Sequence, residues 1–124
     1  MIGILTRETS FKTAFAPEPV CNNFAVKGGG DFALSSKSFI KTSEDLIFAM
    51  SSAPSVVGRE KELKLPIGVL FGEDDEILDA KLHGEKFSEL TGAELKILPN
   101  KGHMLPLTEP EECAEFIHGI MKKI

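Results

Sequence analysis

Apolar residues follow two different periods along the second half of the chain. Residues 67–71 form a short, nearly continuous apolar run, which is typical of a strand buried on both faces of a parallel sheet. Apolar positions then recur at helical spacing from Ala80 to Leu90, and Gly92 marks the expected end of that helix. Residues 93–98 predict a second strand.

A further helix is predicted to begin at residues 108–111. The sequence Thr-Glu-Pro-Glu there has the form of a capping box, with proline in the first turn. Five apolar side chains then fall on one helical face: Cys113, Phe116, Ile117, Ile120 and Ile124. The order strand, helix, strand, helix is an α/β pattern.

The first half of the chain is richer in Ser, Gly, Phe and Pro, and its pattern is weaker. Residues 43–50 predict a helix, because Thr42 and Asp45 imitate a capping box and Leu46 and Met50 recur at helical spacing. Ala53-Pro54 should end that helix. Residues 27–31, with three consecutive glycines, predict a loop.

Composition excludes several classes of protein. The 124 residues suffice for one domain, with 42% hydrophobic and 27% charged residues, as in soluble globular proteins. A net charge of −5 with dispersed basic residues argues against nucleic-acid binding. No apolar run approaches the ~20 residues of a membrane span, and charge follows the first residues too soon for a signal peptide. Cys21 and Cys113 lack metal-ligand spacing and are expected to be reduced, so we expect a cytoplasmic protein.

Two polar motifs follow the two predicted strands. Gly72-Glu73-Asp74-Asp75 comes after the first strand, and Gly102-His103 after the second. The carboxyl ends of neighbouring parallel strands meet at one edge of the sheet, where reacting groups gather. A carboxylate that accepts the Nδ1 proton of an imidazole fixes its tautomer and prepares it as a base. We therefore predict Asp75 and His103 as catalytic residues, with Asp74 as the alternative acid.

The order of these motifs resembles the end of the α/β-hydrolases. In that family the acid follows a Gly-x-x-Asp turn and the histidine a Gly-His turn, in that chain order. The resemblance implies that residues 64–124 form the C-terminal part of the catalytic core, a parallel sheet with flanking helices. Residues 1–63 would form a partly helical cap or lid, with an apolar underside made by phenylalanines: Phe15, Phe24, Phe32, Phe39 and Phe48.

The resemblance also implies an activity. His103 and Asp75 would be the base and acid of a Ser-His-Asp triad that hydrolyses a small ester-like substrate, without a cofactor. No serine of this chain lies in a Gly-x-Ser-x-Gly elbow, which the family places in a segment that would precede the cap. The alternative is an inactive relic that serves as an interaction module or binds a small apolar ligand.

Other candidate residues favour structural roles. His83 and His118 lie on predicted helices, and residues 27–31 lack the Gly-Lys-Ser/Thr ending of a phosphate loop. The acidic turn at residues 73–79 lacks the spacing and the glycine of an EF-hand, so we predict no metal site. Two parallel strands leave both sheet edges open, so we expect self-association or a missing N-terminal half as partner.

Overall fold

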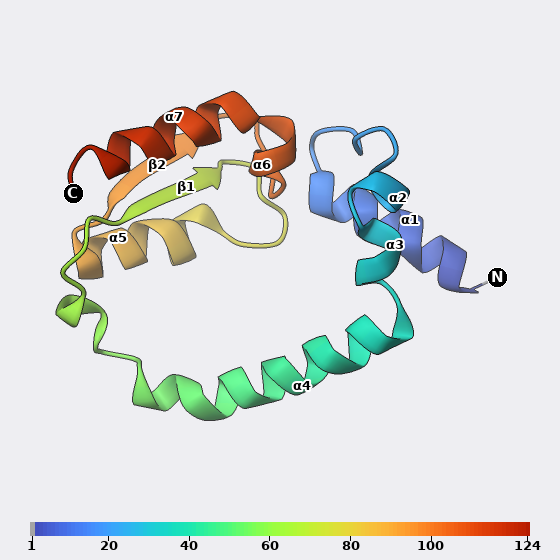
Figure 1. Ribbon diagram of the computed structural model, residues 1–124, viewed down its shortest axis with the longest axis horizontal. Helices are drawn as coiled ribbons and strands as arrows, with labels where there is room; N and C mark the ends of the chain where they lie inside the picture. The colour runs from blue at the N-terminus through green and yellow to red at the C-terminus, as the bar shows by residue number, and fades with distance from the viewer. Residues whose placement is uncertain (1) are drawn as a thin grey trace.

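A parallel pair of short strands forms the centre of the C-terminal part of the protein (Figure 1). The structure is a computed structural model that describes residues 2–124, with the side chains of residues 7–124. Strand β1 (Gly68–Gly72) pairs with β2 (Glu94–Leu98), and the register runs from Gly68 opposite Glu94 to Gly72 opposite Leu98. Both predicted strands are therefore present, each within about one residue of its expected bounds.

Helices cover the two faces of this strand pair, one above and one below in Figure 1. Helix α7 (Pro110–Met121) lies against Gly68, where a Cβ atom would come within 2.6 Å of Ile120. On the other face lies a π-helical turn, η3 (Ala80–Glu85), which continues into α5 (Lys86–Thr91). Gly84 of this turn packs on Phe71 and Leu95 of the strands. The absence of a side chain at Gly68 and Gly84 lets both helices approach the sheet closely.

The ends of these helices differ in part from the predicted signals. Gly92 ends α5 in the left-handed conformation, with φ of 73°, as expected. Asp79 caps η3 by accepting from the Leu82 amide at 2.8 Å. The predicted capping box before α7 is wrong, because Thr108 ends a separate turn, α6 (Leu105–Thr108), and its hydroxyl donates to the Met104 carbonyl.

Three helices of the N-terminal part meet around a cluster of phenylalanines. They are α1 (Ile2–Phe15), α2 (Phe24–Lys27) and α3 (Gly30–Ala33). The ring of Phe24 makes edge-to-face contacts with Phe11 and Phe15, at centroid distances of 5.0 and 4.9 Å. The loop predicted at residues 27–31 is shorter in the structure. It is a turn at Gly28 and Gly29, because Lys27 belongs to α2 and Gly30 to α3.

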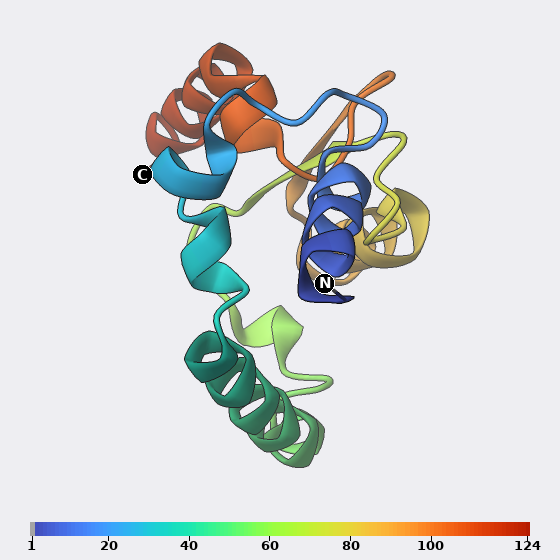
Figure 2. The same ribbon diagram turned by 90° about the vertical axis from the view of Figure 1, so that its right-hand side faces the viewer.

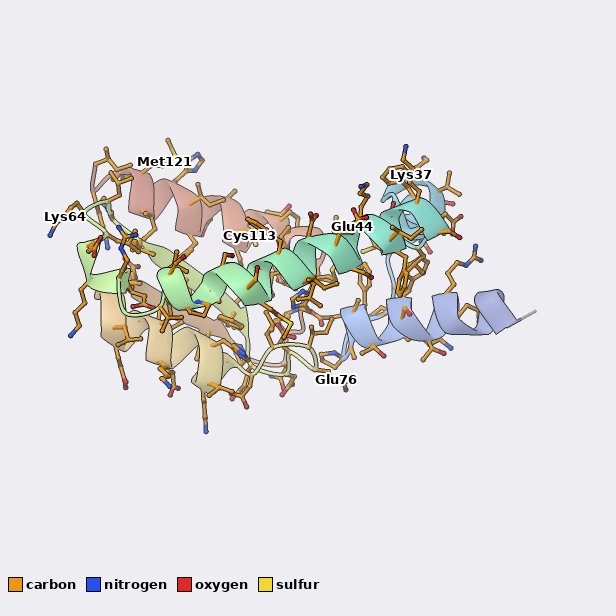
Figure 3. The ribbon with its side chains drawn as sticks, turned by 90° about the horizontal axis from the view of Figure 1, so that it is seen from below. Lys37, Glu44, Lys64, Glu76, Cys113 and Met121 are labelled. Atoms are coloured by element: carbon orange, nitrogen blue, oxygen red, sulfur yellow. The ribbon has the colours of Figure 1, made fainter. Side chains whose placement is uncertain are left out.

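Helix α4 (Ser36–Ser52) extends away from the strand pair (Figures 1 and 2). It begins seven residues before the predicted start, since Ser35 caps it by accepting from the Ser38 amide. Pro54 ends it as expected, in a 3₁₀ turn (Ala53–Ser55). A second 3₁₀ turn (Glu60–Glu62) leads to the sheet. No residue of α4 is buried, and seen from below the helix crosses in front of the other elements (Figure 3).

The predicted fold class is wrong. The part of the chain that the structure describes is 58% helical and its sheet has two strands, so it is a mostly helical small domain and not the C-terminal part of an α/β-hydrolase. The strand–helix–strand–helix order is local to residues 68–121. The reason for the difference is physical: a many-stranded parallel sheet needs further buried strands, and the described N-terminal residues form helices instead.

The phenylalanines expected on one cap surface do not share one environment. Phe15 is fully buried and packs on Phe24, whereas Phe32, Phe39 and Phe48 are exposed. Cys21 and Cys113 are both half-buried and form no disulfide in the described part of the chain. Among the described residues, no helix combines the length and the apolar character that crossing a bilayer requires.

Phe15 should dominate the stability of the N-terminal helices. It is 0% exposed, so Phe15→Ala is expected to lower the free energy of unfolding by about 3–5 kcal/mol. The matched control is Phe48→Ala, because Phe48 is 72% exposed and its loss should change the free energy by no more than about 0.5 kcal/mol. Urea unfolding followed by circular dichroism measures both, and equal losses would contradict this assignment of the core.

Candidate functional site

Asp75 and His103 are in direct contact beyond the carboxyl ends of the two strands. Oδ2 of Asp75 lies 2.8 Å from Nδ1 of His103. The other carboxylate oxygen, Oδ1, accepts from the backbone amides of Ile77 and Leu78 at 2.8 and 2.9 Å. Each carboxylate oxygen therefore has at least one donor, and the imidazole is held by one of its two ring nitrogens.

Backbone hydrogen bonds hold the two motifs together. The Glu73 amide donates to the Leu98 carbonyl and the Asp74 amide to the Lys101 carbonyl, both at 2.9 Å. Gly72 is needed at this point, because a Cβ atom there would lie 2.2 Å from the Lys101 carbonyl oxygen. Backbone pairing of the two parallel strands alone thus places the acid motif beside the histidine motif, without any side-chain contact.

The surroundings of Asp75 keep it ionised. Its burial favours the neutral acid, but the hydrogen bonds from Leu78, His103 and Ile77 outweigh this effect, so the pKa of Asp75 lies below its ordinary value of 3.8. An ionised carboxylate only accepts hydrogen bonds, so Nδ1 of His103 must carry the proton. In the neutral ring Nε2 is then the unprotonated nitrogen, and this is the nitrogen that can act as a base.

Two apolar hollows adjoin this pair. The Asp75 side chain is only 4% exposed, whereas that of His103 is 34% exposed, so a reactant reaches the pair through the imidazole. A hollow of about 240 Å³ is lined by Leu70, His103, Leu105, Pro106, Cys113 and Ile117. A smaller one of about 150 Å³ lies between His103, Asp75 and Leu78. Their apolar walls suit a short acyl or alkyl group beside the base.

The thiol of Cys113 and seven serine hydroxyls of the described residues are poorly suited to act as the nucleophile. Cys113 lines the larger hollow, but burial, with the nearby charges of Glu109 and Glu112, raises the pKa of its thiol. A protonated thiol is a poor nucleophile. Seven serine hydroxyls donate to other acceptors, namely those of Ser35, Ser38, Ser43, Ser51, Ser52, Ser55 and Ser88.

The remaining candidates make other contacts than the one between Asp75 and His103. His83 is exposed, and its Nδ1 contacts the backbone carbonyl of Asp79 at 2.9 Å. It lines a wide acidic hollow of about 820 Å³ whose wall also includes Asp75, together with Glu73, Glu76 and Glu85. Within residues 7–124, no group of three or more His, Cys, Asp or Glu side chains is arranged to hold a metal ion. Asp74, the alternative acid, is exposed, and Asp75 makes the contact to His103.

One residue beside the site was not predicted from the sequence. Oε2 of Glu18 accepts from the backbone amide of Gly102 at 2.9 Å, across 84 positions of the chain. The only local signal is that Glu18 stands between Pro17 and Pro19, which keep the segment out of a helix. Nothing in that signal identifies the partner, which is set by tertiary packing.

Comparisons with protein-family models, with curated proteins and with solved structures find no match for this chain.

The ionised Asp75 should make the stability of the fold depend on acid. Because its folded-state pKa is below the unfolded value, its contribution is complete above pH 3.8 and is lost as the pH falls through the lower folded-state pKa. Asp75→Asn is expected to be less stable at pH 7 and to show a shallower loss below about pH 5. Urea unfolding at pH 7, 5, 4 and 3 measures the effect.

The matched control for this experiment is Asp74→Asn, in the exposed neighbour of Asp75. We expect it to keep the acid-dependent loss of the wild type. A shallower loss in Asp74→Asn together with an unchanged loss in Asp75→Asn would reverse the choice of acid.

Proposed function

We propose that Asp75 and His103 supply the acid and the base of a Ser-His-Asp type centre that hydrolyses a small ester-like substrate. The observation that carries this proposal is the 2.8 Å contact between a nearly buried, ionised Asp75 and a partly exposed His103. The resemblance to the α/β-hydrolases belongs to the same proposal and concerns the two motifs alone, since the fold differs. A cytoplasmic location is proposed with it, because both thiols are free.

In the proposed reaction, Nε2 of His103 removes a proton from an attacking hydroxyl group. The oxygen of that group forms a bond to the ester carbonyl carbon, and the bond to the leaving alkoxide breaks. The imidazolium returns its proton to the alkoxide, which leaves as the alcohol. Asp75 holds the ring by Nδ1 throughout and stabilises its positive charge.

The nucleophile in this proposal is water or a hydroxyl group of a second polypeptide. Cys113 is disfavoured by its raised thiol pKa, and seven serine hydroxyls donate to other acceptors. A water molecule would make the protein a weak esterase by itself. A serine brought by a second chain would complete a triad and raise the rate. The acyl ester formed on that serine would then be cleaved by a water molecule that Nε2 of His103 deprotonates, which releases the acid and returns the proton to the serine oxygen.

Hydrolysis of p-nitrophenyl acetate tests the pair. His103→Ala is expected to lower the rate at least about a hundredfold, which is the usual contribution of a positioned general base. The matched control is His83→Ala, because His83 is an exposed histidine that contacts only a backbone carbonyl. Equal rates for wild type and His103→Ala, with unchanged circular dichroism, would refute the proposal.

A second candidate function is an interaction module, and the surface of α4 favours it. The helix exposes a stripe of apolar residues at helical spacing: Phe39, Ile40, Leu46, Ile47 and Met50. Contiguous apolar surface of this kind marks protein contacts or apolar ligands. We propose self-association through this stripe as the simplest form of that function.

Analytical ultracentrifugation tests the second candidate. Leu46→Glu is expected to shift an oligomeric wild type to monomer, because it places a charge in the centre of the stripe. Lys37→Glu introduces the same acid at an exposed position of α4 outside the stripe and should leave the oligomer intact. A wild type that sediments as a single monomeric species would contradict self-association.

A further inference from the structure

The carboxylate of Glu18 is largely enclosed beside the turn that carries His103. Its side chain is only 15% exposed, and Oε1 has no hydrogen-bond partner. Nζ of Lys101 forms a long ion pair with that oxygen at 4.0 Å and a closer one with Glu109. A buried carboxylate oxygen without a hydrogen bond destabilises the folded protein unless the hydrogen bond to the other oxygen offsets that loss.

That other contact is with the turn that carries His103. Oε2 accepts from the Gly102 amide, one residue before the imidazole. Hydrogen bonds to an ionised acceptor are about twice as strong as those between neutral groups. Glu18 therefore fixes the peptide immediately before His103, while Asp75 fixes the ring itself.

The chain around Glu18 supports the same turn along its length. The Ala16 carbonyl oxygen packs so closely on Gly102 that a Cβ atom there would lie 1.9 Å away. The Cys21 thiol lies 3.8 Å from the Leu107 carbonyl, its acceptor in the turn that follows His103. Residues 16–21 thus pack along residues 102–107, although the two segments lie far apart in the sequence.

We infer that Glu18 is a positioning residue for His103, acting through the Gly102 amide. This inference deepens the proposed function and rests on it. Glu18 touches no reacting group, and its effect is to keep the imidazole within hydrogen-bonding distance of Asp75. A misplacement of about 1 Å in such a pair can cost about a hundredfold in rate.

Three variants separate this role from a general contribution to stability. In Glu18→Ala the Gly102 amide loses its acceptor, and its hydrogen exchange should become at least about tenfold faster. Glu18→Gln keeps a carbonyl acceptor and should give an intermediate rate. Glu109→Gln is the matched control, because it removes the other carboxylate beside Lys101 and leaves the Gly102 contact in place.

Hydrogen exchange and the proton NMR resonance of the His103 Nδ1–H are measured on the full chain. We expect Glu18→Ala to broaden that resonance, Glu18→Gln to restore it in part, and the amides of β1 and β2 to keep their wild-type rates. Unchanged Gly102 exchange in Glu18→Ala would overturn the inference. So would uniformly faster exchange in β1, β2 and Gly102 alike, since that result reports general destabilisation.

Ester hydrolysis provides the functional readout. We expect a loss of about tenfold to a hundredfold in Glu18→Ala and a smaller one in Glu18→Gln. If wild type and His103→Ala hydrolyse the ester equally, the proposed function fails, while the NMR readouts still decide whether Glu18 positions the ring. If the wild type is active and Glu18→Ala matches it, the inference fails and the proposed function stands.

Discussion

Parallel pairing between β1 and β2 brings residues 28 positions apart into contact at one edge of the sheet. Its register sets Gly72 opposite Leu98, and the amides of Glu73 and Asp74 continue the pairing into the turns. The Asp75–His103 contact depends on this backbone arrangement, because neither side chain lies in a strand. A shift of one residue in the register would reverse the side-chain faces of the strand and displace the acid from the base.

The protein buries little of its apolar surface. Among residues 7–124 the buried hydrophobic side chains are those of Phe15, Ala93, Leu98 and Leu105. Two of them, Leu98 and Leu105, flank the histidine turn, and Phe15 ends the helix that leads into the Glu18 segment. Two of the four buried side chains thus stand close to His103 in the chain, while α4 contributes none.

The sequence predicts the candidate site better than the fold around it. The apolar run before Gly72 and the one before Gly102 are local signals, and parallel pairing of two such strands is enough to place Asp75 beside His103. The fold class depends on how many strands pair with one another, and a local pattern of residues does not predict that number. The cap of α4 at Ser35 was missed because Thr42 offered a similar signal inside the helix. The role of Glu18 depends on packing across 84 residues, which sequence periodicity does not report.

The unequal exposure of the two catalytic candidates has a consequence for ligand binding. The Asp75 side chain is 4% exposed, whereas that of His103 is 34% exposed and lines the apolar hollow beside Leu105 and Cys113. A ligand in that hollow would therefore contact the imidazole and not the carboxylate that holds it. The Ile77 and Leu78 amides would meanwhile keep their bonds to Asp75, so the orientation of the ring does not depend on which ligand is bound.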